Sequence, residues 1–272
     1  MKIAILGSKG FIGSYLQSHF WSSKYKVIPV TRDSLNLIDY NQVQFWLLKN
    51  KPDVVINCAI SGGGTKVNEI NFQDAQQNIT VFFNFFNSAQ SFRYINIGSG
   101  AEFDKLMNIN EASEFDIFHR LPKDSYGYSK NIISRAIRNR DNFYTLRLFG
   151  CFGSTEPATR LFKKFLSHRI DYINDRYFDY FSVSDFAKVV EYYCNASDVQ
   201  LIKDINCVYP KKLLLSEILS KLNKVKNIDL PIYTDGTVYN SYTGSTLNLS
   251  RLCKTEDFPV LDGLEKGLEV YE

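Results

Sequence analysis

The sequence predicts an α/β fold in which helices cover both faces of a parallel sheet. Three observations support this prediction. Short apolar runs alternate with helix-like stretches up to about residue 149. The first apolar run, residues 2–6, ends in a glycine-rich segment that opens a helix. The 272 residues are enough for one large domain with a smaller lobe.

Each element follows from its local pattern. The run "KIAIL" is short, apolar and bounded by glycine, which is typical of a buried parallel strand. Similar runs predict further strands, and longer stretches between them predict helices. The expected strands are 2–6, 25–30, 52–59, 94–99 and 142–150, and the expected helices include 7–20, 40–50, 74–92 and 124–140.

The pattern changes after residue 149. Helices are expected within 159–168, 177–193 and 211–222, and one returning segment is expected to rejoin the sheet. We therefore predict a dinucleotide-binding domain made of 1–148 and a returning segment at about 178–208. The remaining parts, about 149–177 and 209–272, are expected to form a smaller substrate-binding lobe.

Composition excludes several classes of function. The formal net charge of +3 is too small to indicate a nucleic-acid partner. The three histidines and five cysteines form neither an HExxH nor a CxxC motif, so we expect no metal site and no disulfide framework. No apolar run approaches the ~20 residues of a membrane helix. "MKIAIL" leaves no room for a signal peptide, and we expect a cytoplasmic protein.

The glycine segment predicts a nucleotide site. Gly7, Gly10 and Gly13 have the spacing GxxGxxG between a strand and a helix, with Phe11 and Ile12 inside the motif. Glycine lets backbone N–H groups approach a pyrophosphate, and a helix N-terminus favours its charge. A ligand-free turn would look the same in isolation, but this motif directly follows the first strand.

The end of the second strand bears on the choice of cofactor. An acidic residue at that position would favour the ribose 2′-OH of NAD. The sequence instead has Thr31 and Arg32, and a guanidinium suits the 2′-phosphate of NADP. Lys9 is expected to reach the same phosphate. Asp33 follows directly, so NAD(H) remains the alternative.

A second motif predicts chemistry at the sheet edge. Tyr126 and Lys130 lie one turn apart at the start of a predicted helix, and Ser99 ends the fourth strand. A ketone reductase must deliver a proton to the carbonyl oxygen, and we expect Lys130 to lower the pKa of Tyr126 for that purpose. Ser99 is expected to bind and orient the same oxygen.

These motifs together resemble a known family. The segments "GSKGFIG", "PDVVINCA", "INIGSGAEFD", "YGYSK", "RLFGCFG" and "VSDFAKVVEYY" are similar to the extended short-chain dehydrogenase/reductases that act on nucleotide sugars. The likeness covers about residues 1–200. Within the family, "VTRDSLNLID" is most similar to the GDP-fucose synthase-like 4-keto reductases.

The resemblance implies a Rossmann-type fold with a C-terminal substrate-binding lobe, and NADPH as cofactor. Arg32 and Lys9 would meet the 2′-phosphate. Ser99, Tyr126 and Lys130 would be the catalytic triad, and Asn78 would support the site. The expected substrate is a nucleoside-diphosphate 4-keto-6-deoxysugar, reduced to a deoxysugar nucleotide for surface polysaccharide or glycan synthesis.

The chain departs from these relatives at several positions. Where GDP-fucose synthase has an epimerase cysteine, this chain has Ala101, and "CFGSTEPATRLF" lacks the second epimerase residue, a histidine. Gly100 and Ala101 also replace the Asp-Glu pair of the sugar-nucleotide dehydratases. We therefore expect reduction without epimerisation or dehydration, with Ser99, Gly100 and Ala101 facing the substrate.

A phosphate-binding arginine of many relatives is replaced here by Phe178. Arg176 is the nearest substitute, with Arg160, Lys163 and Lys164 as alternatives. Two other functions stay open: a nucleotide-sugar 4-epimerase that keeps NAD bound, and a non-catalytic NADP-binding protein. Apolar residues around most of helix 74–92 predict a homodimer through helices 74–92 and 124–140.

Overall fold

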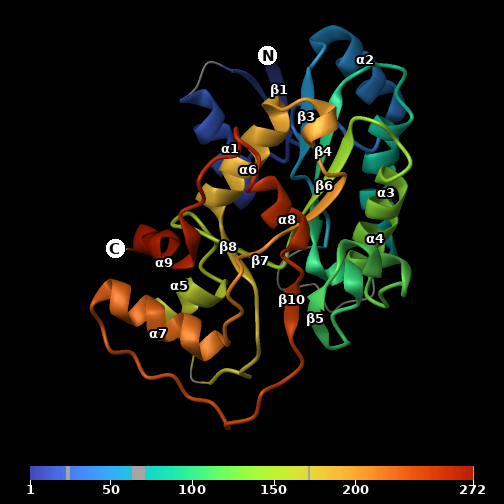
Figure 1. Ribbon diagram of the computed structural model, residues 1–272. Coiled ribbons are helices and arrows are strands. Elements are labelled where there is room, and N and C mark those ends of the chain that lie inside the picture. The colour runs from blue at the N-terminus through green and yellow to red at the C-terminus, as the bar shows by residue number, and fades with distance from the viewer. Residues whose placement is uncertain (23–24, 63–70, 171, 272) are drawn as a thin grey trace.

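The computed structural model describes residues 1–22, 25–62, 71–170 and 172–271, and its centre is a six-stranded sheet (Figure 1). The strand order is β2-β1-β3-β4-β6-β9, and every neighbouring pair is parallel. The order reverses between β1 and β3. The strands are β1 (Lys2–Leu6), β2 (Lys26–Val30), β3 (Val54–Asn57), β4 (Arg93–Ser99), β6 (Phe143–Leu148) and β9 (Asp204–Cys207).

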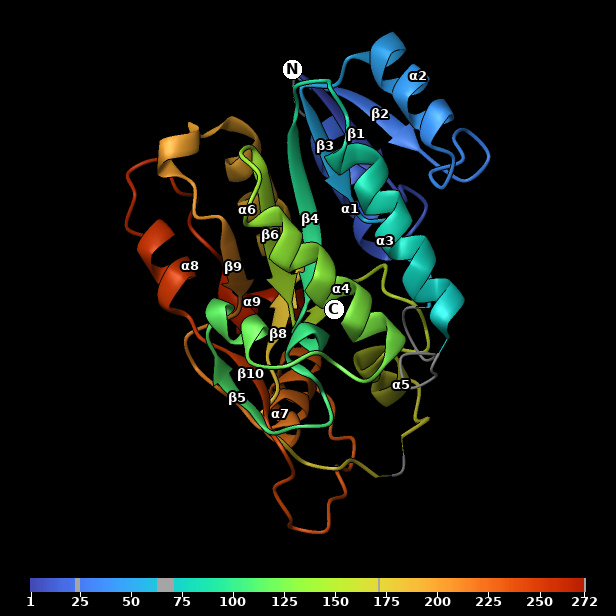
Figure 2. The same ribbon diagram turned by 90° about the vertical axis from the view of Figure 1, so that its right-hand side faces the viewer.

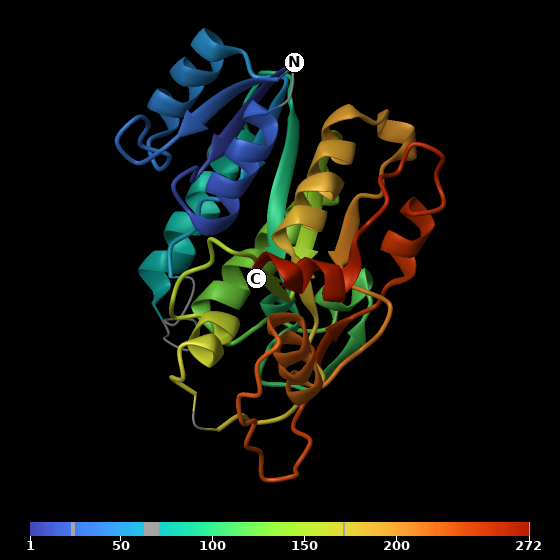
Figure 3. The ribbon, with the colours of Figure 1, turned by 90° about the vertical axis from the view of Figure 1, so that its left-hand side faces the viewer.

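Helices cover both faces of this sheet. On one face α1 (Phe11–Trp21) and α6 (Val183–Asn195) lie side by side (Figure 3). On the other face lie α2 (Tyr40–Asn50), α3 (Phe72–Phe86) and α4 (Ser125–Ile137) (Figure 2). The fold is therefore the predicted α/β architecture, a parallel sheet wound on both faces.

Strand β1 shows how the sequence builds two cores at once. Ile3 and Ile5 belong to the apolar cluster beneath α1 and α6. Ala4 and Leu6 belong to the cluster beneath α2, α3 and α4. All four are fully buried. Successive side chains of a strand point to opposite faces, so a strand covered on both faces must be apolar throughout.

A smaller lobe lies at the carboxyl edge of the sheet (Figures 1 and 3). It contains α5 (Leu161–Leu166), α7 (Leu215–Lys226) and α9 (Gly263–Leu268), and these helices share a separate apolar cluster. The parallel pair β7 (Gly150–Phe152) and β8 (Tyr180–Ser182) leads the chain into the lobe and out of it. Helix α8 (Leu247–Leu252) instead contacts β9.

A second short parallel pair joins the lobe to the main domain. It consists of β5 (Ile109–Ala112) and β10 (Tyr242–Gly244). Neither strand was predicted, nor was β7. Runs of three or four residues whose partners lie far along the chain leave no periodic signal in the sequence. Strand β10 matters because it brings the lobe to the end of β4.

Helix α3 is shorter than its predicted span of 74–92. It begins at Phe72, where the Asn71 side chain accepts from two backbone N–H groups, and it ends at Phe86. The chain then turns into β4 at Arg93. Phe82 and Phe85 are fully buried within the chain, which removes part of the sequence argument for an exposed apolar helix.

Two further searches of the described residues were negative. Among them, no helix combines the length and the apolar character needed to cross a bilayer. Outside the gaps at 23–24, 63–70, 171 and 272, no group of three or more His, Cys, Asp or Glu side chains is arranged to hold a metal ion.

A buried ion cluster lies below the carboxyl ends of three neighbouring strands. Arg147 on β6 is fully buried, 2.7 Å from Glu102 in the turn after β4 and 2.9 Å from Asp204 on β9. It also donates to Asn206, at 2.9 Å. Burial raises the pKa of Glu102, and Arg147 opposes that shift. Burial alone would lower the pKa of Arg147, but the two carboxylates raise it, so the guanidinium stays charged.

Candidate active site

The glycine loop between β1 and α1 forms a tight backbone cradle. Gly7 has φ +72°, and a Cβ there would lie 2.8 Å from the Ala59 backbone. A Cβ on Gly13 would lie 2.3 Å from the Gly7 carbonyl oxygen. Gly10 precedes α1, and no side chain caps the helix start. Because the loop needs glycine and leaves these first amides without a side-chain cap, its geometry fits a dinucleotide pyrophosphate.

Phe11 and Ile12 begin α1 directly after this cradle. The Phe11 ring lies under the Arg160 guanidinium, with 5.6 Å between Cζ and the ring centroid. Ile12 packs against the apolar cluster beneath α1 and α6. Phe11 therefore connects the loop to the lobe, and Ile12 anchors it to the core.

Two cations and one carboxylate lie at the end of β2. Lys9 from the glycine loop pairs with Asp33 at 2.7 Å, although both side chains are largely exposed. The Lys9 ammonium lowers the pKa of Asp33. Arg32 is exposed and has no hydrogen bond or ion pair to any residue in the described part of the chain. Asp33 is thus paired with Lys9, and the neighbouring Arg32 guanidinium has no polar partner among the described residues.

Ser99 is fixed at the end of β4. Its N–H donates to Glu102 Oε1 at 2.8 Å, and its hydroxyl accepts from the Ala101 N–H at 3.2 Å. These reciprocal bonds cap the 3-10 turn Gly100–Phe103. Ser99 is only 8% exposed, so this turn determines where its hydroxyl points.

Gly100 and Ala101 are packed tightly within this turn. A Cβ on Gly100 would come within 2.4 Å of the Phe149 ring, so the position requires glycine. Ala101 is 2% exposed. Their expected contact with a substrate stays a prediction.

Helix α4 carries Tyr126 and Lys130 past the same turn. The helix begins after Asp124, whose side chain accepts from the Gly127 N–H at 2.8 Å. A Cβ on Gly127 would lie 2.5 Å from the Ala101 carbonyl oxygen, so glycine lets the helix approach closely. Tyr126 is thereby brought to Ser99, and hydrogen bonding with Ser99 contributes to its pKa.

The Tyr126 pKa departs from the sequence expectation. We expected Lys130 to lower it, but the pKa is raised, because burial of the phenol outweighs every opposing effect. The opposing effects come from hydrogen bonding with Ser99 and from the positive charge of Arg160. The phenol therefore holds its proton at neutral pH.

Lys130 lies deeper than a surface lysine. It is 4% exposed, and its ammonium donates to the Ile97 carbonyl oxygen at 2.6 Å. Burial lowers its pKa from 10.5 to about 8, and the carboxylate of Glu102 opposes that shift. The ammonium is thus present at pH 7 but close to its titration range.

Asn78 ties the loop after β3 to α4. Its side chain accepts from the Ser61 N–H at 2.8 Å and donates to the Ser129 hydroxyl at 3.2 Å. Ser129 precedes Lys130 in α4. Asn78 therefore holds the helix in register, in agreement with the supporting role expected for it.

Sequence reasoning missed Tyr242. Strand β10 places its ring edge-on against Phe149, 5.2 Å between centroids, next to the turn that follows Ser99. Burial raises the pKa of its phenol, and Tyr126 raises it further. No local signal marks Tyr242 among the 17 tyrosines. Only the pairing of β10 with β5 brings it to the site.

The predicted phosphate ligands have separate environments. Arg176 lies against Tyr239, 6.0 Å from Cζ to the ring centroid. Arg160 donates to the Cys151 carbonyl oxygen at 2.8 Å and lies 3.5 Å from Glu156. Lys163 lies over the Tyr271 ring at 5.3 Å. Arg160 is therefore anchored rather than freely solvated, and among these three it is the one whose charge acts on Tyr126.

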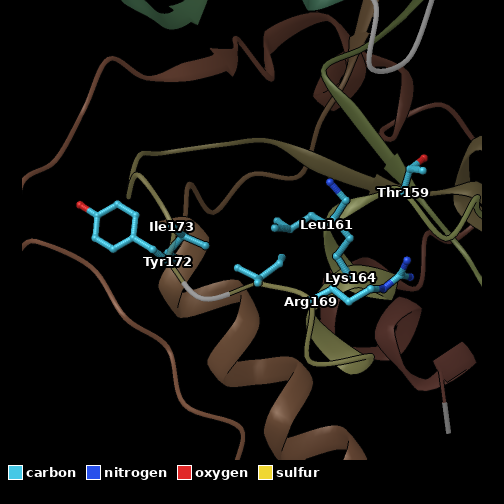
Figure 4. A pocket seen from close by; sticks show the side chains of 7 residues that line it. Thr159, Leu161, Lys164, Arg169, Tyr172 and Ile173 are labelled. Carbon is cyan, nitrogen blue, oxygen red and sulfur yellow. The ribbon is translucent and has the colours of Figure 1, made fainter.

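A pocket of about 580 Å³ opens beside α5 (Figure 4). Lys164 and Arg169 lie on one side of it and Tyr172 on the other. Arg169 is held by hydrogen bonds to Ser167 and to the Ala158 carbonyl oxygen. The pocket lining is Thr159, Leu161, Lys164, Arg169, Ile170, Tyr172 and Ile173.

The sequence and the fold of this chain were compared with those of known proteins. A family model described as the NAD dependent epimerase/dehydratase family matches residues 3–199. A search of curated proteins found no match.

Solved structures share the whole fold. A dTDP-4-dehydrorhamnose reductase from Clostridium acetobutylicum has a TM-score of 0.79 at 18% identity, over 100% of this chain and 98% of that chain. A GDP-mannoheptose C4 reductase from Campylobacter jejuni, with NADP bound, has a TM-score of 0.71 at 18% identity, over 99% and 98%. A UDP-Glc/GlcNAc 4-epimerase from Campylobacter jejuni has a TM-score of 0.74 at 16% identity, over 99% and 97%.

The buried ammonium of Lys130 generates a prediction about stability. A pKa of about 8 in place of 10.5 means that burying the charged Lys130 lowers the free energy of unfolding by roughly 3 kcal/mol at pH 7. Lys130→Met removes this cost but also the bond to Ile97. We expect a net gain of about 1–2 kcal/mol in the free energy of unfolding, measured by urea denaturation at pH 7.

The stability advantage of Lys130→Met is expected to fall as pH rises. Between pH 8 and 10.5 the unfolded chain holds the Lys130 proton and the folded chain does not, so the wild type gains stability as pH rises. The advantage of Lys130→Met should therefore shrink across that range. Lys254→Met, at an exposed lysine, is the matched control. A lower stability of Lys130→Met at pH 7 would contradict the argument.

Proposed function

The chain belongs to the NAD dependent epimerase/dehydratase family, and on that premise we propose that it is an NADPH-dependent reductase of a nucleoside-diphosphate 4-keto-6-deoxysugar. The observation that carries the proposal is that the start of α4, which holds Tyr126, packs at Gly127 against the turn that Ser99 caps at the carboxyl end of β4. The glycine loop lies at the same edge. Fold neighbours crystallised with NADP or NADPH include two reductases and a GDP-heptose synthase.

The proposed chemistry divides simply between cofactor and protein. NADPH would supply the hydride. Tyr126 would give its proton to the carbonyl oxygen, and its raised pKa keeps that proton available. Ser99 would donate a hydrogen bond to the same oxygen. Lys130 would supply positive charge behind the phenol as negative charge develops on it.

Ala101 supports reduction rather than epimerisation. Its methyl side chain has no acid or base function, and its N–H is used by Ser99. An epimerase that moves protons on the sugar ring needs an acid or base at such a position. The proposal therefore assigns Ser99, Gly100 and Ala101 to the carbonyl side of the substrate.

The pocket beside α5 supports a nucleotide-bearing substrate. Lys164 and Arg169 are two cations suited to a diphosphate, and the exposed Tyr172 ring offers a stacking surface for a base. We propose that this pocket takes the nucleotide end of the substrate. Arg176 remains a proposed contact to phosphate, and the division into two domains remains a proposal as well.

Tyr126→Phe tests the assignment of the proton donor. We expect turnover to fall ~10²–10⁴-fold with NADPH affinity nearly unchanged, because the phenol acts on the carbonyl oxygen alone. Loss of NADPH absorbance with a panel of 4-keto-6-deoxysugar nucleotides measures it. Tyr128→Phe, at an exposed tyrosine of the same helix, is the control. More than half of wild-type turnover in Tyr126→Phe would reject the assignment.

Arg32→Ala tests the cofactor. A charge-assisted phosphate contact contributes about 1.5–3 kcal/mol, or roughly 10- to 150-fold. NADPH affinity should fall by that factor and NADH affinity much less, as measured by calorimetry. Arg251→Ala removes an exposed arginine on α8 as the control. Equal losses for both cofactors would show that Arg32 does not meet the 2′-phosphate.

We also propose a homodimer through α3 and α4, which lie side by side on one face (Figure 2). Phe72 at the start of α3 is 80% exposed, and Tyr128 of α4 is also exposed, so the pair offers apolar surface to a second copy. Light scattering at micromolar concentration should give twice the chain mass of 31.3 kDa. A mass near that of one chain would exclude the dimer.

A further inference from the structure

Arg160 joins the lobe to the glycine loop of the main domain. It directly precedes α5 of the lobe, yet its guanidinium lies over the ring of Phe11, with 5.6 Å between Cζ and the ring centroid. Phe11 is the first residue of α1 and follows Gly10 of the loop. A charged group of the lobe is therefore placed near the start of α1, beside the backbone whose shape fits a pyrophosphate.

Two polar contacts fix this guanidinium. Its Nη2 donates to the Cys151 carbonyl oxygen at 2.8 Å, and its Nε lies 3.5 Å from the Glu156 carboxylate. Glu156 is only 5% exposed, and it accepts from the Tyr271 hydroxyl at 2.6 Å. The same hydroxyl accepts from the Gly153 N–H at 3.2 Å. Tyr271 thus holds the carboxylate that in turn holds Arg160.

These contacts leave part of the guanidinium unused. A guanidinium carries its N–H donors in a planar fork, which suits phosphate oxygens. Within the described part of the chain, Arg160 has no hydrogen bond beyond that to Cys151 and no ion pair beyond that with Glu156. Its side chain is 36% exposed. Both donors of Nη1 are therefore available to a ligand that enters from solvent.

The charge of Arg160 has the same sign as the nearby end of α1. The first N–H groups of a helix have no intrahelical acceptor and carry partial positive charge. No side chain caps these groups in α1. A cation near a helix N-terminus is unfavourable unless an anion lies with it. The arrangement of Arg160 and α1 therefore suits an anion bound by both.

Arg160 is not part of the pocket beside α5. Its chain neighbours Thr159 and Leu161 line that pocket, and Arg160 does not (Figure 4). The pocket has two cations of its own, Lys164 and Arg169. Arg160 therefore belongs with the glycine loop rather than with the pocket proposed for the nucleotide end of the substrate.

We propose that Arg160 is a cofactor-binding residue contributed by the lobe, which donates to the diphosphate of NADPH opposite the first N–H groups of α1. Glu156 and Tyr271 are positioning residues, because they act through Arg160. The inference rests on the proposed function in taking NADPH as the cofactor, and it requires nothing of the substrate.

Arg160→Gln tests the inference by calorimetry of cofactor binding without substrate. The affinity for NADPH should fall roughly 10- to 150-fold, because a hydrogen bond to a charged group contributes that much. The affinity for NADH should fall by the same factor, since both cofactors contain the diphosphate. Arg32→Ala differs, because it is expected to weaken NADPH much more than NADH. Arg251→Gln, at an exposed arginine of α8, is the matched control and should bind both cofactors like the wild type.

Adenosine 2′-monophosphate separates a lost contact from a damaged site. It carries the 2′-phosphate found in NADPH but no diphosphate, so Arg160→Gln should bind it with unchanged affinity. Retained binding also shows that the variant is folded. Arg160→Lys is the second variant. It keeps the charge but not the planar fork, so it should lose less affinity for NADPH than Arg160→Gln does.

Each outcome decides the inference. Equal fold losses for NADPH and NADH, with the monophosphate still bound, support it. Unchanged affinity for both cofactors would overturn it and leave Arg160 with a structural contact to Phe11. A loss for NADPH alone would place the guanidinium at the 2′-phosphate, and a loss of all three ligands would show a general disturbance of the loop; either result would overturn it.

The same measurements separate this inference from the proposed function. A wild type that binds NADPH but reduces no 4-keto-6-deoxysugar nucleotide would contradict the proposed function and leave the binding test of Arg160 intact. A wild type that binds neither NADPH nor NADH would overturn both.

Discussion

The contact between Arg147 and Glu102 is the interaction on which the geometry of the candidate active site depends. Glu102 uses one carboxylate oxygen to hold the Ser99 N–H and the other to meet Arg147, which also reaches Asp204 on β9. The turn after β4 is thereby fastened to two further strands. Removing one partner of such a buried pair typically costs about 3–5 kcal/mol, because the other charge is left without compensation. Because moving the Glu102 carboxylate away from Arg147 is so costly, the carboxylate holds the Ser99 backbone in one position.

Helix α4, which carries Tyr126, is fixed in position by contacts with the same turn. The Asn131 side chain, one residue after Lys130, donates to the Glu102 carbonyl oxygen at 2.8 Å and to the Ile117 carbonyl oxygen at 2.9 Å. Close approach at Gly127 brings α4 against Ala101. Ser99 and Tyr126 lie far apart in the sequence, but both are positioned by one four-residue turn. A disturbance of the ion cluster would therefore move both hydroxyls together.

Sequence patterns predicted the parts of this structure that obey local rules. "KIAIL" and "YNQVQFWLLKN" correspond to β1 and α2, and the glycine loop, Ser99, Tyr126 and Lys130 all fall at the carboxyl edge of the sheet. The missed features depend on distant partners. Arg147 within "FYTLRLF" is buried only because Glu102 in the turn after β4 and Asp204 on β9 come to it from distant parts of the chain. Tyr242 reaches the turn after β4 through a three-residue strand, and α3 ends early because the chain must enter β4.

The error about the Tyr126 pKa has the same origin. Spacing in a helix shows that a lysine follows one turn later, but it does not show how far the two groups are withdrawn from water. Burial disfavours whichever form is charged, so it raises the pKa of Tyr126 and lowers that of Lys130 to about 8. The two shifts have opposite signs and one cause. At pH 7 they leave Tyr126 protonated and Lys130 still charged, and for the proposed reaction this is the combination that suits giving a proton to a carbonyl oxygen. Above pH 8 the ammonium would be lost while the phenol kept its proton, so for the proposed reaction the burial of Lys130 is expected to set the upper pH limit of activity.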